Sequence, residues 1–485
     1  MKKYKVFFPI FVLTIILCFS LILMTFKIEK LMIFIGDFGW FYLAARDMLL
    51  IGVVPLVSIP SSHPWLHQGP YWTYLLALGL YFFDYHPLIG AYISIFFGIL
   101  SICGLYFLGK EMFGTKMSLI STMLYATSPL VIVHARMPYH TSPIPFFVIC
   151  YMYCFYKWVN GQTTYLPFVF LFLGILYNFE LAAVILFAPV IGVFLHSFAF
   201  KRKIELSKKT VLISVILFLV SMFPIIIYDL SHGFPQTFKF IAWMGYRVLR
   251  IFGFPSIHGE SGDDINNSFF VSYSLTLLQR LIFLAHGWIA IVVLIVSSLV
   301  LMFDSLKKNK YEKYLSSQKT LLILFSIPFL GYVFNRTPSE AYIPLFFPSI
   351  FLLLGYTFTK FLNSKSLRYV TGVVFISLIV SNPLHLLRQN YFMGSRDGGY
   401  GVTFTQRMGV VQIIEDISLN KEVQLIGKGK GSEFESYLMG YEYLLWWQGV
   451  RVSKEKNAQK IILEEKGSQI LLEIEGKASK SAMLQ

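Results

Sequence analysis

The sequence predicts a polytopic α-helical membrane protein with about eleven transmembrane helices and a small α/β domain after the last helix. Of the 485 residues, 56% are hydrophobic and only 14% are charged, whereas a soluble domain carries about 25% charged residues. Long apolar runs recur as far as residue 387, and the remainder of the chain has many charges and few such runs. This composition excludes an ordinary soluble enzyme, a disordered chain and a fibrous protein.

The apolar runs have the length of transmembrane helices, each of which needs about 20 mainly apolar residues. The predicted spans are 5–26, 88–108, 117–135, 141–158, 164–178, 180–199, 210–229, 277–302, 319–335, 341–359 and 368–387. Asn178 and Glu180 interrupt the run over 164–199, which favours a helical hairpin over one long helix. The first span begins with lysines as a signal peptide does. Its apolar run is longer than that of a signal peptide and no cleavage site follows, so we expect an uncleaved transmembrane helix.

The formal net charge of +15 by itself suggests nucleic acid or another acidic partner. With the N-terminus on the cytosolic side, the connections on that side carry a net charge of +15, and the rest of the chain sums to zero. Basic residues are enriched in the cytosolic loops of membrane proteins. We therefore expect a multi-pass protein of the cytoplasmic (plasma) membrane, with a cytosolic N-terminus, an external C-terminal domain and no nucleic-acid partner.

The chain is expected to form two domains. Residues 1–387 are the membrane domain, in which the loop over 27–87 is external, and residues 388–485 are the external α/β domain. In the second domain, sequence patterns predict helices near 403–418 and 433–447 and strands near 422–427, 459–465 and 469–475. The four cysteines lie in apolar runs, where buried thiols are expected and disulfides are not.

The first external loop contains a carboxylate, Asp37, directly after the first span. Hydrophobic residues recur behind it at helical spacing, which predicts a helix along the outer membrane interface: Phe38, Phe41, Tyr42, Ala45, Met48 and Leu49. Asp37 has two compatible interpretations, the N-cap of this helix or a functional carboxylate. Arg46 and Asp47 are interpreted either as a solvated helix face or as part of a site. A second helix is expected over 71–83.

Sequence motifs of nucleotide-dependent and metal-dependent enzymes are absent from the chain. It has no Walker loop, no dinucleotide-binding fingerprint, no HEXXH motif and no DxD motif of nucleotide-sugar enzymes. No cluster of ligands has the spacing of a metal site. No cofactor is therefore predicted from the residues.

The order of several motifs resembles the GT-C glycosyltransferases, in particular the family 39 type with protein O-mannosyltransferases and lipid A aminoarabinose transferases. The first motif is an acidic residue followed by a Tyr-x-x-x-Arg-x-Met-Leu helix that ends at a glycine: Asp37, Tyr42, Arg46, Met48, Leu49 and Gly52. The later motifs are Gly69-Pro70-Tyr71-Trp72 before a helix, Ser128-Pro129 with Arg136, and Arg336 before Tyr342 and Pro344. The resemblance covers roughly residues 5–360.

Three positions depart from the family pattern. Phe38 stands where the family often has a second carboxylate, and Gln68-Gly69 where many members have a lysine. His140-Thr141-Ser142 stands where many have an aspartate. The contacts to the donor phosphate and the identity of the substrate therefore do not carry over. A divalent metal is left open by the resemblance and is not indicated by the residues.

The resemblance implies a hexosyl- or pentosyltransferase of the cell envelope. Its donor is a sugar on a polyprenyl phosphate, and its acceptor is a glycan, a lipid or a protein on the outer face of the membrane. Transfer with inversion needs a group that takes the proton of the acceptor hydroxyl, and the resemblance implies Asp37 in that role. The residues expected to bind the donor phosphate are Arg136, Arg336 and Tyr342, and the candidates for a supporting role are Arg46, His67 and Glu340. Packing and interfacial snorkelling are the alternatives for the phosphate-binding residues.

A transporter or flippase of lipid-linked sugars is the alternative function. Such a protein needs polar or charged groups along a path through the membrane. The predicted span centres are nearly free of charge, and the ionisable residues gather near the outer face. This distribution favours chemistry at the surface over transport. The external α/β domain is then expected to recognise the acceptor or to cover the reaction cavity.

Overall fold

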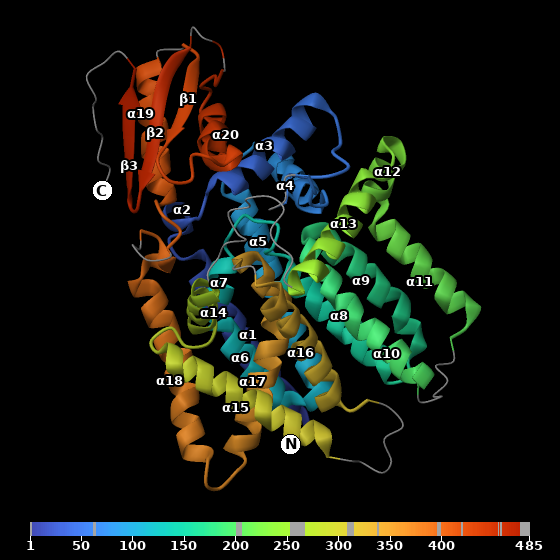
Figure 1. The fold of residues 1–485 in the computed structure, drawn as a ribbon. Coiled ribbons are helices and arrows are strands. Elements are labelled where there is room, and N and C mark those ends of the chain that lie inside the picture. The colour runs from blue at the N-terminus through green and yellow to red at the C-terminus, as the bar shows by residue number, and fades with distance from the viewer. Residues whose placement is uncertain are drawn as a thin grey trace.

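The computed structural model describes residues 2–61, 65–199, 206–252, 267–307, 315–336, 339–394, 399–418, 421–453, 455 and 458–475. These residues are mainly helical and contain one three-stranded sheet, which lies near the C-terminal end of the chain (Figure 1). The N-terminus and this sheet lie at opposite ends of the molecule (Figure 1).

The N-terminal part of the chain forms the first predicted span and both predicted helices of the first loop. The elements are α1 (Lys2–Thr25), α2 (Ile28–Leu31), α3 (Gly36–Ile51) and α4 (Tyr71–Phe82). Helix α3 ends at Gly52, whose backbone is left-handed (φ 78°), a conformation that glycine adopts without steric cost. The helices predicted behind Asp37 and over 71–83 are confirmed.

The middle of the chain contains spans with interruptions. Its helices are α5 (Ile89–Phe113), α6 (Thr115–Ala126), α7 (Pro129–His134), α8 (Ile144–Val159), α9 (Leu166–Phe179), α10 (Phe187–Ala199), α11 (Lys208–Ser221), α12 (Phe223–His232) and α13 (Pro235–Ile251). The prediction of one helix over 117–135 is wrong, because Pro129 disfavours helical backbone at the preceding residue and Ser128 is extended. Helices α11 and α12 are bent by 71°. Helix α9 ends at Phe179, so Glu180 does interrupt the run over 164–199.

The last membrane helices are α14 (Asn267–Ile282), α15 (Gly287–Leu306), α16 (Ser317–Asn335), α17 (Phe347–Leu362) and α18 (Arg368–Arg388). The prediction of a single helix over 277–302 is wrong, because the chain breaks between α14 and α15. Asn382 of α18 fills the break: its amide donates to the Ile282 carbonyl and its oxygen accepts the Leu284 N–H, both at 2.9 Å. Backbone groups freed by a break in an apolar environment need such partners.

Five described helices are long and apolar enough to cross a membrane, or six if α11 and α12 form one bent span. Further apolar helical stretches are shorter: Ile144–Val159, Thr163–Phe179, Leu181–Leu195 and Phe347–Leu362. Short 3-10 segments join several helices: η1 (Thr163–Tyr165), η2 (Leu181–Leu186), η3 (Glu340–Leu345), η4 (Asn390–Phe392) and η5 (Glu435–Leu438). The polytopic helical fold is confirmed, and the number of eleven spans stays a prediction.

Residues 399–475 form a small α/β assembly, which we call the C-terminal unit. Its elements are α19 (Phe404–Ser418), β1 (Val423–Lys428), α20 (Met439–Trp447), β2 (Gln459–Lys466) and β3 (Gln469–Ile474). The strand order is β1-β2-β3. Strands β1 and β2 are parallel, with Leu425 opposite Ile461, and β2 and β3 are antiparallel, with Leu463 opposite Leu472. The helices and strands predicted for this region are confirmed.

The C-terminal unit packs directly on the first loop through α20 and α3, which lie side by side (Figure 1). Gly39 of α3 faces Gly440 of α20 so closely that a Cβ on Gly39 would overlap the Gly440 backbone. Beside this crossing, the Tyr42 and Tyr443 rings meet edge to face at 4.9 Å. Arg46 lies over the Trp446 ring at 4.9 Å. The contact therefore fixes α3 against the C-terminal unit along much of its length.

Candidate active site between two cavities

Asp37 lies in the first turn of α3 and is half-buried. The interpretation of Asp37 as the N-cap is wrong, because α3 begins at Gly36 and its N-cap is Ile35. A carboxylate in the first turn is stabilised by the positive end of the helix dipole. The side chain of Asp37 is therefore in a favourable place for a negative charge and is not engaged in capping.

A cavity of about 170 Å³, here called cavity 1, lies at the junction between the start of α3 and the C-terminal unit. Asp37 and the residues Phe34 to Gly36 line one side of it. The other side consists of residues of the C-terminal unit: Arg407, Gly431, Phe434, Ser436, Tyr437, Gly440, Tyr441 and Glu465. Asp37 thus faces a set of polar and aromatic side chains that come from the far end of the chain.

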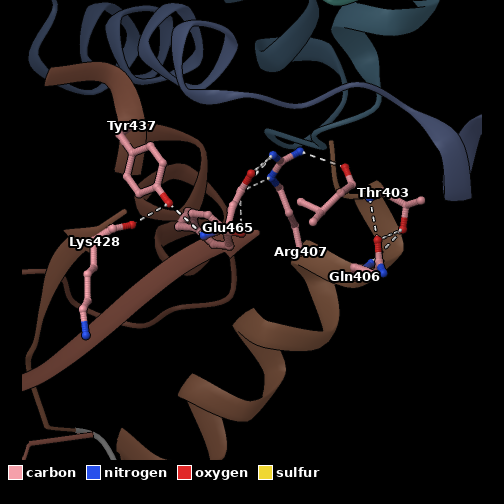
Figure 2. A network of polar contacts seen from close by, with 8 residues as sticks. Thr403, Gln406, Arg407, Lys428, Tyr437 and Glu465 are labelled. Atoms are coloured by element: carbon pink, nitrogen blue, oxygen red, sulfur yellow. Dashed lines mark hydrogen bonds and ion pairs between the residues drawn. The ribbon is translucent and has the colours of Figure 1, made fainter. Parts of the chain in front are cut away.

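The polar wall of cavity 1 is organised around Arg407 and Glu465 (Figure 2). Arg407 Nη2 contacts both carboxylate oxygens of Glu465, at 2.9 and 3.0 Å, and Nε donates to Oε1 at 3.2 Å. Tyr441 donates to Glu465 Oε1 at 2.7 Å, and the Glu465 N–H donates to the Tyr437 hydroxyl at 2.9 Å. Burial by itself lowers the pKa of Arg407, but the Glu465 carboxylate and Tyr441 raise this pKa above its ordinary value. The pair is therefore held ionised and in fixed geometry.

On its other side, Asp37 is close to Tyr139, which lies in the connection between α7 and α8. The Tyr139 ring packs against Phe38 at 4.6 Å and against His140 at 4.1 Å. Burial raises the pKa of Tyr139 well above its ordinary value, and the nearby charges of Asp37, Glu180 and Tyr342 raise it further. Tyr139 is therefore a neutral hydrogen-bond donor that lies within electrostatic reach of Asp37.

Glu180 and His140 form a second polar pair near Tyr139. The Glu180 carboxylate caps η2 by accepting the Ala182 N–H at 3.2 Å, and its other oxygen lies 3.4 Å from His140 Nε2. Both side chains are buried. A buried polar group needs hydrogen-bond partners, and these contacts supply them to Glu180.

A second cavity, here called cavity 2, has a volume of about 660 Å³ and mostly apolar walls. Its lining includes Ile185 of η2, Pro328 and Tyr332 of α16, and Trp243 of α13. Two arginines and a tyrosine also reach it: Arg247, Arg336 and Tyr342. An apolar space with guanidinium groups suits a lipid that carries a phosphate, because arginine binds phosphate oxygens with two hydrogen bonds at once.

Tyr139 relates the two cavities to each other. Asp37 lines cavity 1, Tyr342 lines cavity 2, and Tyr139 is close enough to both residues for their charges to act on its hydroxyl. A polar pocket with a carboxylate and an apolar pocket with arginines therefore both have a residue near Tyr139. Such a pair of pockets suits two substrates of different polarity.

Comparison with known proteins identifies the architecture. Residues 62–228 match the family of dolichyl-phosphate-mannose-protein mannosyltransferases. ArnT from Cupriavidus metallidurans, bound to undecaprenyl phosphate, superposes with a TM-score of 0.57 at 12% identity, over 96% of this chain and 93% of ArnT. The oligosaccharyltransferase AglB from Archaeoglobus fulgidus, in complex with an inhibitory peptide and a dolichol-phosphate, has a TM-score of 0.54 at 13% identity, over 91% of this chain and 64% of AglB. This chain has the GT-C fold. No curated protein is similar to it in sequence at a significant level.

The resemblance to the GT-C superfamily that the motif order predicts is confirmed. In the GT-C fold of this chain, two of the predicted phosphate-binding residues, Arg336 and Tyr342, lie together at cavity 2. Arg336 ends α16 in the left-handed conformation (φ 51°). The two side chains reach the same space although Arg336 lies at the end of α16 and Tyr342 in η3.

The third predicted phosphate-binding residue, Arg136, lies among other partners. It is 1% exposed, its guanidinium stacks on the Tyr391 ring at 3.8 Å, and Nη2 donates to the Phe26 carbonyl at 3.1 Å. These contacts join the end of α7 to the end of α1 and to η4. Its role at the donor phosphate stays a prediction.

Glu340, a candidate for a supporting role, belongs to a polar cluster beside the site. It accepts a hydrogen bond from Tyr400 at 2.5 Å and lies 2.8 Å from His134 Nε2. Burial raises the pKa of Glu340, but His134, Tyr400 and the charge of Arg280 outweigh burial and hold the pKa below its ordinary value. The cluster ties α7, η3 and the start of the C-terminal unit together.

The other two candidates for a supporting role have structural contacts. Arg46 donates to Asp47 at 2.8 Å besides lying over Trp446. His67 exchanges two backbone hydrogen bonds with the Gln236 side chain, at 3.2 and 2.9 Å. These contacts hold α3 to α20, and the first loop to α13. Catalytic roles for Arg46 and His67 stay predictions.

The sequence reasoning missed four residues of the site: Tyr139, Arg247, Arg407 and Glu465. Tyr139 lies three positions after Arg136, so the motif at Arg136 is the sequence signal that lies nearest to it. Arg247 lies on an amphipathic helix within a region expected to be a loop. Arg407 and Glu465 are far apart in the chain, and no local pattern links them. Within the described residues, no group of three or more His, Cys, Asp and Glu side chains is arranged to hold a metal ion.

Proposed function

We propose that this chain is a membrane glycosyltransferase that moves a sugar from a polyprenyl-phosphate donor to an acceptor at the outer face of the membrane, with Asp37 as general base. The observation that carries the proposal is the position of Asp37 in the wall of cavity 1, opposite polar side chains of the C-terminal unit. The GT-C fold supports it, because ArnT was solved with undecaprenyl phosphate and AglB with dolichol-phosphate.

Cavity 2 is the proposed donor site. Its apolar walls suit the first units of a polyprenyl chain, and Arg247, Arg336 and Tyr342 reach the same space for the phosphate. Negative charge grows on the phosphate as it leaves the sugar, and a fixed guanidinium stabilises that charge in the transition state. Arg136, at the end of α7, is proposed to stabilise the donor phosphate through the electric field of its positive charge.

Cavity 1 is the proposed acceptor side. The acceptor hydroxyl attacks the anomeric carbon, the bond from that carbon to the phosphate oxygen breaks, and Asp37 takes the hydroxyl proton. The polyprenyl phosphate leaves with the electron pair of the broken bond. Tyr139, neutral and close to Asp37, is proposed to orient the carboxylate by a hydrogen bond.

The orientation in the membrane follows from charge. The connections assigned to the cytosol carry the whole net charge of +15, which supports an external position of Asp37 and the C-terminal unit. The acceptor is then a glycan, lipid or protein outside the cytosol. Hexosyl and pentosyl donors both remain within the proposal, because no described contact selects the sugar.

The test uses the full chain purified into lipid nanodiscs and a panel of polyprenyl-phosphate hexoses and pentoses, with a membrane extract as the acceptor source. Mass spectrometry measures the released polyprenyl phosphate and the glycosylated product. Asp37→Asn is expected to lower the rate by at least about 100-fold, the usual range for loss of a general base. Asp84→Asn, which changes an exposed carboxylate of the same predicted loop, is the matched control and should keep the rate.

Two outcomes contradict the proposal. Full activity of Asp37→Asn removes Asp37 from the mechanism. Movement of a sugar lipid across vesicles, with no release of polyprenyl phosphate from any donor, makes the chain a flippase.

A further inference from the structure

Cavity 1 is closed on one side by α3 and on the other by the C-terminal unit, so it exists only when the two are packed together. Its volume of about 170 Å³ is far larger than the space needed for one water molecule and has room for one sugar ring. Phe434 lies at its edge and is 55% exposed, so the cavity is reached from the surface of the molecule.

The charged pair in cavity 1 has hydrogen-bonding capacity left for a ligand. A carboxylate has about four acceptor positions. Glu465 Oε1 accepts from Arg407 Nε, from Arg407 Nη2 and from Tyr441, whereas Oε2 accepts from Arg407 Nη2 alone among the described residues. Oε2 therefore has room for a hydroxyl donor. Because the carboxylate is already fixed, binding costs little additional ordering of side chains.

The charges around cavity 1 select against an anionic ligand. Arg407 is 3% exposed and is neutralised by Glu465. Asp37 adds a further negative charge on the opposite wall. A phosphate or carboxylate in this space would face two carboxylates and only one paired cation, so a neutral ligand is favoured.

The aromatic residues of cavity 1 complete a pattern that suits carbohydrate. Phe34, Phe434, Tyr437 and Tyr441 line it. A sugar ring has hydroxyl groups at its edge and an apolar C–H face. A pocket with aromatic walls and a few fixed polar groups matches both properties.

We infer that cavity 1 binds one neutral sugar residue of a carbohydrate acceptor, with Glu465 Oε2 accepting one of its hydroxyls and Asp37 facing another. This inference rests on the proposed function, since it names the acceptor class of the same site. It makes Arg407 and Glu465 acceptor-binding residues contributed by the C-terminal unit.

The test measures binding separately from transfer. The probes are the methyl glycosides of mannose, glucose, galactose and N-acetylglucosamine, added to the full chain in nanodiscs and followed by ligand-observed NMR. At least one of them is expected to bind saturably to the native chain and to Asp37→Asn. Glu465→Gln is expected to weaken this binding about tenfold, the size of one hydrogen bond to a charged group. Phe434→Ala is expected to weaken it as well, because an aromatic wall of the pocket is lost.

Two variants keep the result interpretable if Glu465→Gln fails to fold. Phe434→Trp retains an aromatic edge and is expected to retain binding. Lys430→Ala changes an exposed residue in the same connection and is the matched control. Phe434 is at the surface, so its replacement by alanine leaves the core of the C-terminal unit intact.

The inference is overturned if none of the glycosides binds, or if binding is unchanged in both Glu465→Gln and Phe434→Ala. It is also overturned if glucose 6-phosphate or a serine-containing peptide is bound in preference to every neutral glycoside. Glycoside binding without transfer from any donor overturns the proposed function and leaves the sugar site standing.

Discussion

Gly39 packs against Gly440 at the crossing of α3 and α20, where a Cβ on Gly39 would overlap the Gly440 nitrogen. Gly36, one residue before Asp37, is packed just as closely against the Ser436 backbone. The chain thus uses glycines to bring the helix with the proposed base into direct backbone contact with the C-terminal unit. The position of Asp37 depends on this contact.

Replacing Gly39 is expected to displace α3. The added methyl of Gly39→Ala overlaps the Gly440 backbone, which cannot move as a flexible side chain would. Overpacking of this kind costs about 1–3 kcal/mol. Thermal unfolding should register the loss, and the transfer rate should fall with it.

The matched control is Gly372→Ala in α18, where an added Cβ meets nothing within 4 Å. This variant should be as stable as the native chain or slightly more stable. Equal stability and equal activity of Gly39→Ala and the native chain would show that the crossing does not position α3.

The arginines of cavity 2 are expected to act on the donor. Arg336→Ala should raise the KM for the best polyprenyl-phosphate donor or lower kcat, by about 10- to 100-fold in kcat/KM, because a charge-assisted hydrogen bond is lost. Arg336→Lys should recover part of the loss, since lysine retains the charge and loses the bidentate geometry. Arg388→Ala, at an exposed position at the end of α18, should leave kcat/KM unchanged, and an equal loss there would refute a specific role for Arg336.

Tyr139 is expected to influence Asp37 through its hydroxyl. Tyr139→Phe keeps the ring contacts with Phe38 and His140 and removes the hydrogen-bond donor. The rate should fall by about tenfold, the effect of one hydrogen bond to a charged group, and the pH–rate profile should shift. Tyr81→Phe, at an exposed site, is the control, and a profile identical to the native one in Tyr139→Phe would contradict the role.

The Glu340 cluster is expected to make stability depend on pH. The folded-state pKa of Glu340 lies below its ordinary value of 4.5. Its contribution to the free energy of unfolding is therefore present above the ordinary pKa and is lost as pH falls through the folded pKa. Thermal unfolding from neutral pH to below pH 4.5 should show a smaller loss of stability in Glu340→Gln than in the native chain.

The control for Glu340 is Glu435→Gln, an exposed carboxylate of the C-terminal unit. Its stability should follow the native pH dependence, because the side chain is exposed and lies outside the Glu340 cluster. If the stability of Glu340→Gln falls with pH as steeply as that of the native chain, the Glu340 cluster does not account for the acid sensitivity.

Local patterns predict the local parts of this fold well. The helices α3 and α4 follow from the spacing of apolar residues, and strands β2 and β3 follow from alternation around a short turn. Asp37, Arg336 and Tyr342 were found because each belongs to a motif that is contiguous in sequence. The N-cap of α3 is Ile35, two residues before the predicted Asp37. The packing of Gly36 on the C-terminal unit sets the start of this helix.

The remainder of the site depends on contacts between distant segments. Arg407 and Glu465 become a pair only through the folding of α19 against β2, and Asn382 explains the break between α14 and α15 only once α18 is packed there. Apolar composition likewise cannot distinguish one long helix from two segments joined at a buried break. Such features require the assembled structure.

The contact between α3 and α20 has a consequence for biosynthesis. Helix α3 emerges from the ribosome long before α20, and the domains of a chain generally fold in the order of their synthesis. Until α20 has been made and has folded, the glycine face of α3 has no partner there. Completion of the proposed site is therefore coupled to the folding of α20, and a product truncated before α20 is expected to be inactive.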